Sequence, residues 1–286
     1  MGHFFKSLAT ISALSIIACT PILLSLSPAS AIGSTLLAQV NENNKAKDTK
    51  IAFLIEKLKT DNREEREKIL ERLREIGEEA VPTLIKALKD PDKRVRSGAC
   101  NALGRIYQQD SASSKVSAVV SNLIVALKDS EVQVRRSAAF ALSQMPLSTL
   151  VAESKTITPG IIAALKDQDR DVRIFAVLTL RSRSFADESS LAVPELISAL
   201  KDPDMDVRNL AAFALSNVNA VPALIKALQD PNKDVRLQVI DILPGLYPKQ
   251  EQILPYLRDA LKDPDQDVRH HAAITLALIG EETYSV

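Results

Sequence analysis

The chain has 286 residues, among them 36 basic and 36 acidic side chains, three His, two Cys and no Trp. A net charge of zero gives no long-range field that would attract nucleic acid, so we expect no nucleic-acid partner. With aromatic residues at only 4%, the aliphatic composition suits thin layers of stacked helices better than one thick core.

The N-terminal segment predicts export. Residues 7–26 contain no charge, and Ala29-Ser30-Ala31 fits the small-x-small rule for signal cleavage. We therefore predict a signal peptide over residues 1–31 and a location in the periplasm or another envelope lumen. Two alternatives stay open. Ile16-Ile17-Ala18-Cys19 resembles a lipobox, which would give a lipoprotein anchored at Cys19, and an uncleaved apolar segment would form a membrane tether.

The next segment is polar, with Asn-Glu-Asn-Asn at residues 41–44 followed by Lys-Ala-Lys. Residues 32–48 are therefore predicted to form a flexible linker. Residues 49–286 remain for the folded part of the chain.

A nine-residue pattern recurs through that folded part. It begins with Leu, has Asp at its third position and ends in Val-Arg, as in the copy from Leu88 to Arg96. Seven copies occur, of which the first is degenerate, and their final arginines are 28 to 39 residues apart. Such recurrence is typical of a repeat protein. The copies end at Arg66, Arg96, Arg135, Arg173, Arg208, Arg236 and Arg269.

Each copy lies between two helical patterns. The run before it often begins with Val-Pro, as at Val81 and Val221, and Pro suits the first position of a helix. The Asp-Pro-Asp turn stops this helix and caps the next one. In the second helix of the second repeat, one apolar face is predicted to contain Val95, Ala99, Ala102, Leu103 and Ile106.

One helical hairpin cannot bury its apolar face alone, so we predict an all-α fold, an α-α superhelix of about seven stacked hairpins. The Val-Pro starts, the Leu-Lys-Asp-Pro-Asp turns and the Val-Arg pairs resemble the HEAT repeats, in the short bacterial form of phycobilisome-lyase-type proteins. The resemblance implies a HEAT/ARM-like solenoid whose second helices line the concave surface.

Two columns of charged residues recur with the repeats. The resemblance implies that they form hydrogen bonds between neighbouring repeats, and the alternative is an anion-binding row of arginines. We interpret them as a structural ladder. Its members are Asp90, Arg96, Asp129, Arg135, Asp167, Arg173, Asp202, Arg208, Asp230, Arg236, Asp263 and Arg269.

We expect no catalytic residue, no cofactor and no metal. His270 and His271 are adjacent, so on a helix they point about 100° apart and cannot hold one metal ion together. Cys100 lies beside the core face and has no candidate base. HEAT-type deoxyhypusine hydroxylases bind iron through His-Glu pairs, and no His-Glu dipeptide occurs in this sequence.

A partner surface is predicted on the second helices, opposite their apolar face. There Phe140, Leu178 and Phe213 follow one another at equivalent positions, joined by Ile174, Phe175 and Leu210. The row forms either a groove for a helix or extended peptide or packing between neighbouring repeats. The long connections over residues 107–115, 147–156 and 181–190 are either a binding rim or neutral insertions.

These observations predict an exported, non-enzymatic scaffold that binds a protein of unknown identity. The alternative that the resemblance implies is a bilin lyase or a chaperone associated with phycobilisomes.

Overall fold

The computed structural model describes residues 28–108, 113–180, 189–217, 220–246 and 250–283, and every element within these ranges is helical. The chain divides into two compact units, Met1–Ala46 and Lys47–Val286. Within the described ranges, no helix has both the length and the apolar character needed to cross a bilayer.

Helix α1 (Pro28–Glu56) covers residues 32–48, where the sequence predicted a flexible linker. The side chains of residues 41–50 are exposed, whereas Ile51, Leu54 and Ile55 are buried. These buried residues fix the end of the helix, and no Gly or Pro interrupts residues 34–56. Further turns can therefore extend toward the N-terminus at little cost once the helix is nucleated. The predicted cleavage sequence Ala29-Ser30-Ala31 lies in the first turns of α1, and residues 1–27 lie outside the described ranges.

Seven helical hairpins follow one another in the described part of the second unit, which confirms the predicted all-α repeat fold. The first helices are the end of α1 with the 3-10 turn η1 (Lys57–Lys59), α3 (Val81–Ala87), α5 (Val116–Ala126), α8 (Ser154–Ala164), α10 (Ser189–Ala199), α12 (Val221–Ala227) and α14 (Gln250–Ala260). The second helices are α2 (Arg63–Ile76), α4 (Lys93–Ile106), α6 (Val132–Ser143), α9 (Arg170–Leu180), α11 (Met205–Asn217), α13 (Lys233–Ile242) and α15 (Gln266–Thr283).

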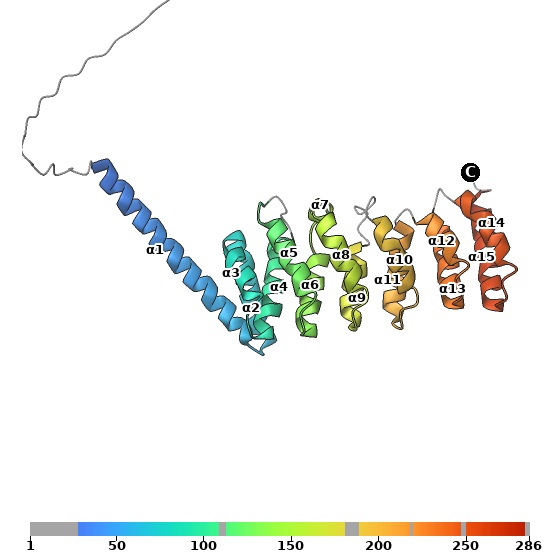
Figure 1. Ribbon diagram of the computed structural model, residues 1–286, viewed down its shortest axis with the longest axis horizontal. Helices are drawn as coiled ribbons and strands as arrows, with labels where there is room; N and C mark the ends of the chain where they lie inside the picture. Colours follow the sequence, from blue (N-terminus) through green and yellow to red (C-terminus); the bar gives the residue numbers. More distant parts are fainter. Residues whose placement is uncertain (1–27, 109–112, 181–188, 218–219, 247–249, 284–286) are drawn as a thin grey trace, which may run out of the picture. The chain divides into compact units, whose positions relative to one another are not determined.

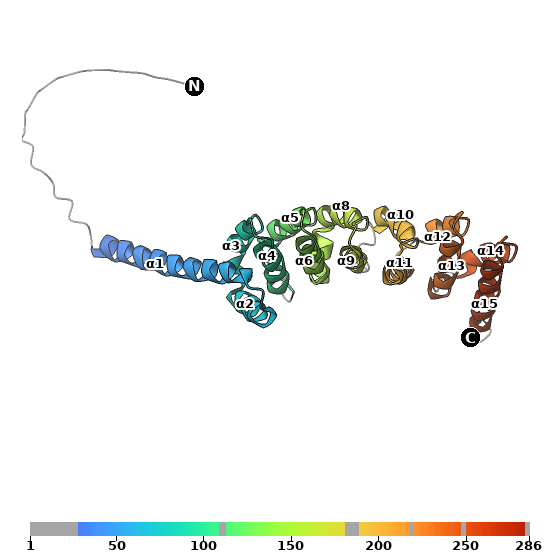
Figure 2. The ribbon, with the colours of Figure 1, turned by 90° about the horizontal axis from the view of Figure 1, so that it is seen from below.

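The hairpins of the second unit form two layers (Figures 1 and 2). From α3 onward the first helices lie in one layer, and the second helices lie side by side in the other, so that α6 packs against both α4 and α9. Short 3-10 turns, η2 (Gly77–Ala80) and η4 (Leu243–Leu246), connect some of the hairpins.

The helix ends follow from local sequence. Pro82 and Pro222 lie in the first turn of α3 and α12, where a missing N–H removes no hydrogen bond. At the start of α4, the Asp92 carboxylate accepts a 2.8 Å hydrogen bond from the backbone N–H of Arg94. The Asn232 side chain caps α13 in the same way, also at 2.8 Å. The turns therefore stop one helix and start the next.

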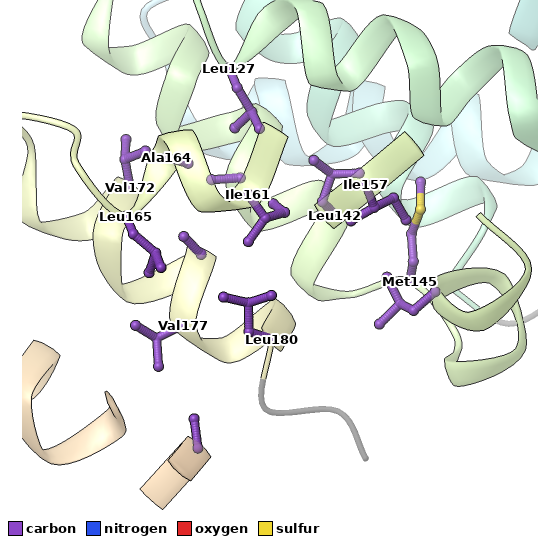
Figure 3. Close-up of a cluster of buried hydrophobic side chains, with 14 of the residues drawn as sticks. Leu127, Leu142, Met145, Ile157, Ile161, Ala164, Leu165, Val172, Val177 and Leu180 are labelled. Carbon is purple, nitrogen blue, oxygen red and sulfur yellow. The ribbon is translucent and has the colours of Figure 1, made fainter. Parts of the chain in front are cut away.

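A single apolar core runs through the hairpins. In the second repeat, Val95, Ala99, Ala102 and Leu103 are fully buried and Ile106 is partly buried, in agreement with the predicted face. Figure 3 shows how the third and fourth hairpins share this core. A buried aliphatic side chain contributes about 1.5–3 kcal/mol relative to an exposed one, so stacking the hairpins stabilises each of them. The core residues labelled in Figure 3 are Leu127, Leu142, Met145, Ile157, Ile161, Ala164, Leu165, Val172, Val177 and Leu180.

The connection predicted at residues 147–156 contains a short helix, α7 (Leu147–Ala152), and the first residues of α8. Leu150 is buried in it, while Leu147 and Val151 are exposed. A run of Leu, Thr, Val and Ala can bury one apolar side chain when it is helical, which explains why this insertion is helical. The other predicted connections lie partly outside the described residues, which omit 109–112 and 181–188.

Candidate functional site

Charged residues in the turns link neighbouring hairpins. Four arginines each donate from Nε and Nη2 to both carboxylate oxygens of the Asp in the next turn, so each pair is bidentate. The N···O distances are 2.8 and 2.9 Å for Arg96–Asp129, 2.7 and 3.1 Å for Arg135–Asp167, 2.6 and 2.8 Å for Arg173–Asp202, and 2.8 and 2.9 Å for Arg236–Asp263.

The same guanidinium groups also close their own turns. Nη1 of Arg96 donates to the carbonyl oxygens of Asp90 at 2.8 Å and Pro91 at 3.1 Å. The Asp carboxylate meanwhile accepts the N–H of the residue two positions later, as Asp90 does from Asp92 at 2.8 Å. One arginine therefore fixes the shape of its own turn and attaches that turn to the next.

The electrostatics of these pairs follow from this geometry. Burial by itself would raise the pKa of Asp129, but hydrogen bonds from the Arg96 side chain and the Glu131 N–H outweigh it and lower the pKa below its ordinary value. The hydrogen bond to Asp129 in turn raises the pKa of Arg96. Both groups are therefore held in their charged forms.

Two predicted ladder arginines lack a carboxylate partner among the described residues. Arg208 and Arg269 keep the two carbonyl contacts of their own turns, at 2.7 and 3.1 Å for Arg208 and at 2.7 and 3.0 Å for Arg269. Asp230, which should pair with Arg208, instead contacts Lys201 Nζ at 2.9 Å. The predicted ladder is therefore interrupted between the fifth and sixth repeats.

The degenerate first copy takes no part in the ladder within the described residues. Arg66 donates from Nη2 to the carbonyl oxygen of Thr60, and its Nε is buried without a hydrogen-bond partner. This agrees with the loss of the Asp-Pro-Asp pattern in that copy.

A second set of ion pairs, which the sequence reasoning missed, connects the beginnings of the second helices. Arg136 contacts Asp169, and Arg170 contacts Asp204 at 3.0 Å and Asp206 at 2.9 Å. Arg170 and Lys233 share one position of the repeat, but Val132 and Met205 occupy it in two other copies, and Arg136 lies just outside the nine-residue pattern, so the sequence shows no continuous column of cations. Lys233 makes equivalent contacts with Asp265 and Asp267 at 3.3 and 3.2 Å.

The predicted apolar row divides into exposed and half-buried members. The exposed fraction is 38% for Phe140 and 53% for Phe213. The half-buried members Ile174, Phe175, Leu178 and Leu210 lie on α9 and α11, and all but Leu178 pack against the core. We call these six residues the outer apolar row.

Phe140 and Phe175 bring two neighbouring repeats together within the outer apolar row. Their ring centroids are 5.2 Å apart in an edge-to-face arrangement, a favourable geometry for aromatic pairs. Phe140 also borders a 190 Å³ depression whose other lining residues include Asn101, Gln108 and Gln144. Packing between repeats therefore holds one side of this ring, and the other side faces a shallow surface depression.

The residues considered for chemistry were Cys100 and the adjacent pair His270 and His271. Burial raises the pKa of the Cys100 thiol to about 12. The His271 ring contacts Asp241 at 3.0 Å, and the two histidine rings are 6.4 Å apart at an angle of 72°. In the described part of the chain, no three His, Cys, Asp or Glu side chains are grouped as metal ligands.

Comparison with known proteins bears on the fold. A family model described as HEAT repeats matches residues 51–143, 158–220 and 221–285. No curated protein matches the chain significantly. Among solved structures, that of Escherichia coli YibA is 25% identical, with a TM-score of 0.49 over 87% of this chain and 91% of that one. A computationally designed armadillo repeat protein for modular peptide recognition is 18% identical, with a TM-score of 0.46 over 69% and 99%.

Proposed function

The chain belongs to the HEAT-repeat family, and on that premise we propose that it is an exported, non-enzymatic scaffold that binds another protein through the outer apolar row. Phycobilisome-lyase-type activity is the contrasting possibility, suggested by the form of the turns.

The observation that carries this proposal is the exposure of aromatic rings at equivalent positions of the second helices. Phe140 on α6 and Phe213 on α11 are both exposed although the same helices bury their opposite faces completely. Large exposed apolar groups gathered on one surface are typical of protein-binding sites. Aromatic side chains also dominate the binding energy of most interfaces.

The half-buried members of the row support the two exposed rings. Phe175 packs edge-to-face against the Phe140 ring. Leu178 lies on α9, which packs against both α6 and α11, and Leu210 lies on α11 together with Phe213. Because the second helices lie side by side (Figure 2), a partner helix or extended segment could cross them and contact both rings. The row would then provide two aromatic anchors on a largely preformed surface.

A pull-down from an envelope fraction with matched variants tests the proposal. The variant carries Phe140→Asp and Phe213→Asp, and the control carries Val125→Asp on α5, in the layer of first helices. Val125 is 70% exposed, so the control adds one charge to an exposed apolar site without emptying the core. We expect wild type and control to recover the same partner and the double variant to lose it. Equal recovery by all three would refute the proposed surface.

Export rests on the uncharged residues 7–26 and the Ala29-Ser30-Ala31 sequence. Mass spectrometry of the N-terminus of the mature protein tests this part. Cleavage after Ala31 gives a chain that begins at Ile32. A lipidated Cys19, with processing blocked by globomycin, would instead establish the lipoprotein form, and an intact N-terminus would favour the membrane tether.

The contrasting activity is tested directly with bilin and an apo-phycobiliprotein. We expect the purified chain to transfer no pigment. Covalent attachment of bilin that depends on this chain would overturn the scaffold proposal.

A further inference from the structure

The ladder shows what the repeated arginines bind through Nε and Nη2, the two parallel donors that we call the guanidinium fork. In four repeats, Nε and Nη2 of the arginine hold both oxygens of one carboxylate at 2.6–3.1 Å, while Nη1 is anchored on two carbonyl oxygens. Each turn therefore presents a preoriented fork to one carboxylate. Such bidentate pairs are both stronger and geometrically more selective than single contacts.

Arg208 presents the same fork without its internal partner. Its Nη1 is anchored on the carbonyl oxygens of Asp202 and Pro203 at 2.7 and 3.1 Å, as in the other repeats. In the described ranges, however, Nε and Nη2 of Arg208 have no hydrogen-bond partner, and Asp230 contacts Lys201 instead. The spacing from Arg208 to Arg236 is 28 residues, the shortest among the copies.

The outer ion pairs also change at this junction. Met205 occupies the turn position that Arg170 holds in the preceding repeat and Lys233 in the following one. Both of those cations contact carboxylates of the next turn, whereas Met205 has no charge and its side chain is exposed. The fifth and sixth repeats are therefore joined by fewer of these ion pairs, and Arg208 is only partly buried.

A depression of 390 Å³ lies at this fork. Its lining includes Lys201, Asp202, Arg208, Asn232 and Gln238. The Asp202 carboxylate is paired with Arg173 and the Asp230 carboxylate with Lys201, so neither of them occupies the Nε and Nη2 donors of Arg208. The amides of Asn232 and Gln238 add neutral donors. The exposed carboxylate of Asp234 also lines the depression and disfavours a dianion, so the site favours a single carboxylate over phosphate.

We propose that Arg208 binds a carboxylate from another polypeptide, an Asp or Glu side chain. This carboxylate would take the position that the Asp of the next repeat occupies in the four bidentate Arg–Asp pairs. The site lies in the turns and is separate from the outer apolar row. It adds an acidic residue to the features that a partner of this chain would carry.

The test uses the full chain and a defined probe, aspartate capped by acetyl and N-methylamide groups, followed by NMR of the arginine Nε–Hε signals. Capped asparagine and inorganic phosphate serve as controls. We expect capped aspartate to shift the Arg208 signal saturably and to leave Arg173 unchanged, because Asp202 already fills that fork. Arg208→Lys should weaken binding roughly fivefold or more, because lysine lacks the fork.

Arg269 provides a control within the same molecule. It has the same carbonyl contacts as Arg208, but it is not among the residues that line the 390 Å³ depression. An Arg208 shift well above that of Arg269 supports the site even if Arg208→Lys is unstable. No shift at Arg208, equal shifts at both arginines, or a larger response to phosphate would overturn the proposal.

Discussion

Arg173 and Asp202 join the fourth repeat to the fifth through two parallel hydrogen bonds of 2.6 and 2.8 Å. Their side chains are only 11% and 8% exposed. Nη1 of the same guanidinium reaches the carbonyl oxygens of Asp167 and Gln168 at 3.0 and 3.1 Å. A single side chain therefore satisfies four acceptors in two turns, and its loss leaves all four without this donor.

The interrupted ladder makes a prediction about stability. Arg173→Ala leaves the Asp202 carboxylate largely buried without its cation, so the free energy of unfolding should fall by about 3 kcal/mol, near the lower end for broken buried pairs. Arg208→Ala removes only two carbonyl contacts and should cost about 1–2 kcal/mol less than Arg173→Ala. Urea denaturation followed by circular dichroism measures both values.

The comparison between these two arginines also separates structure from binding. We expect Arg173→Ala to retain partner recovery at temperatures where the variant is folded. An unchanged free energy of unfolding for Arg173→Ala, or equal losses for both variants, would contradict the structural role of the ladder.

Acid should weaken the ladder. The pKa of Asp129 is lowered in the folded chain relative to its ordinary value of 3.8, so the unfolded state binds protons first as the pH falls. The stability from this group is complete above its unfolded pKa and is lost as the pH falls through the lower folded pKa. We expect the difference in unfolding free energy between wild type and Asp129→Asn to be largest near neutral pH. It should shrink steadily below about pH 4, and a difference that grows in acid would contradict this assignment.

Two glycines test how closely the second helices pack. A Cβ on Gly104 would lie 2.8 Å from the Ala141 Cβ and 2.9 Å from its Cα, so α4 and α6 would have to separate. For a Cβ on Gly98, the three nearest atoms all belong to the Leu58 side chain, with Cδ1 closest at 2.9 Å. Overpacking lowers the free energy of unfolding by about 1–3 kcal/mol. Replacing a helical Gly by Ala raises it by about 1 kcal/mol through helix propensity.

We therefore expect Gly104→Ala to destabilise the chain clearly and Gly98→Ala to have a smaller effect, since a side chain adjusts more readily than a backbone. Thermal melts of the two variants provide the comparison. Equal melting temperatures would show that α4 and α6 can separate without loss.

Cys100 should react only after unfolding. Its thiol is fully buried and its pKa is raised to about 12, so almost no accessible thiolate exists near neutral pH. Ellman's reagent should therefore not react with Cys100 in the native chain. Under denaturing conditions it should find one thiol per chain if Cys19 has been removed with the signal peptide and two if Cys19 remains free. Rapid native reaction of Cys100 would contradict its burial.

The repeat pattern was sufficient to predict the hairpins because each local signal agrees with the packing. Val95 and its helical partners form one face, and Asp92 caps the helix that follows the turn. The ladder residues were also identifiable, since six of the seven copies contain both the Asp and the Arg. What could not be read from one repeat was which Asp each Arg contacts, because the bonds cross between repeats.

Residues outside the repeat were less predictable. The polar residues 32–48 lack a local signal for helix, and their helical state depends on the buried end of α1 at Ile51, Leu54 and Ile55. The interruption at Arg208 depends on the short spacing and on the contact between Lys201 and Asp230, neither of which changes the motif itself. The exposure of Phe140 and Phe213 likewise depends on how neighbouring second helices stack.

Site-specific photo-cross-linking in the cells that produce the protein tests the outer apolar row most directly. p-Benzoylphenylalanine replaces Phe213 on α11 in one variant and Val125 on α5 in the other, both at exposed positions. The account predicts a discrete cross-linked protein from position 213 and none from position 125. Cross-linking of the same protein from position 125 but not from position 213 would place the partner on the opposite layer of helices and contradict the account.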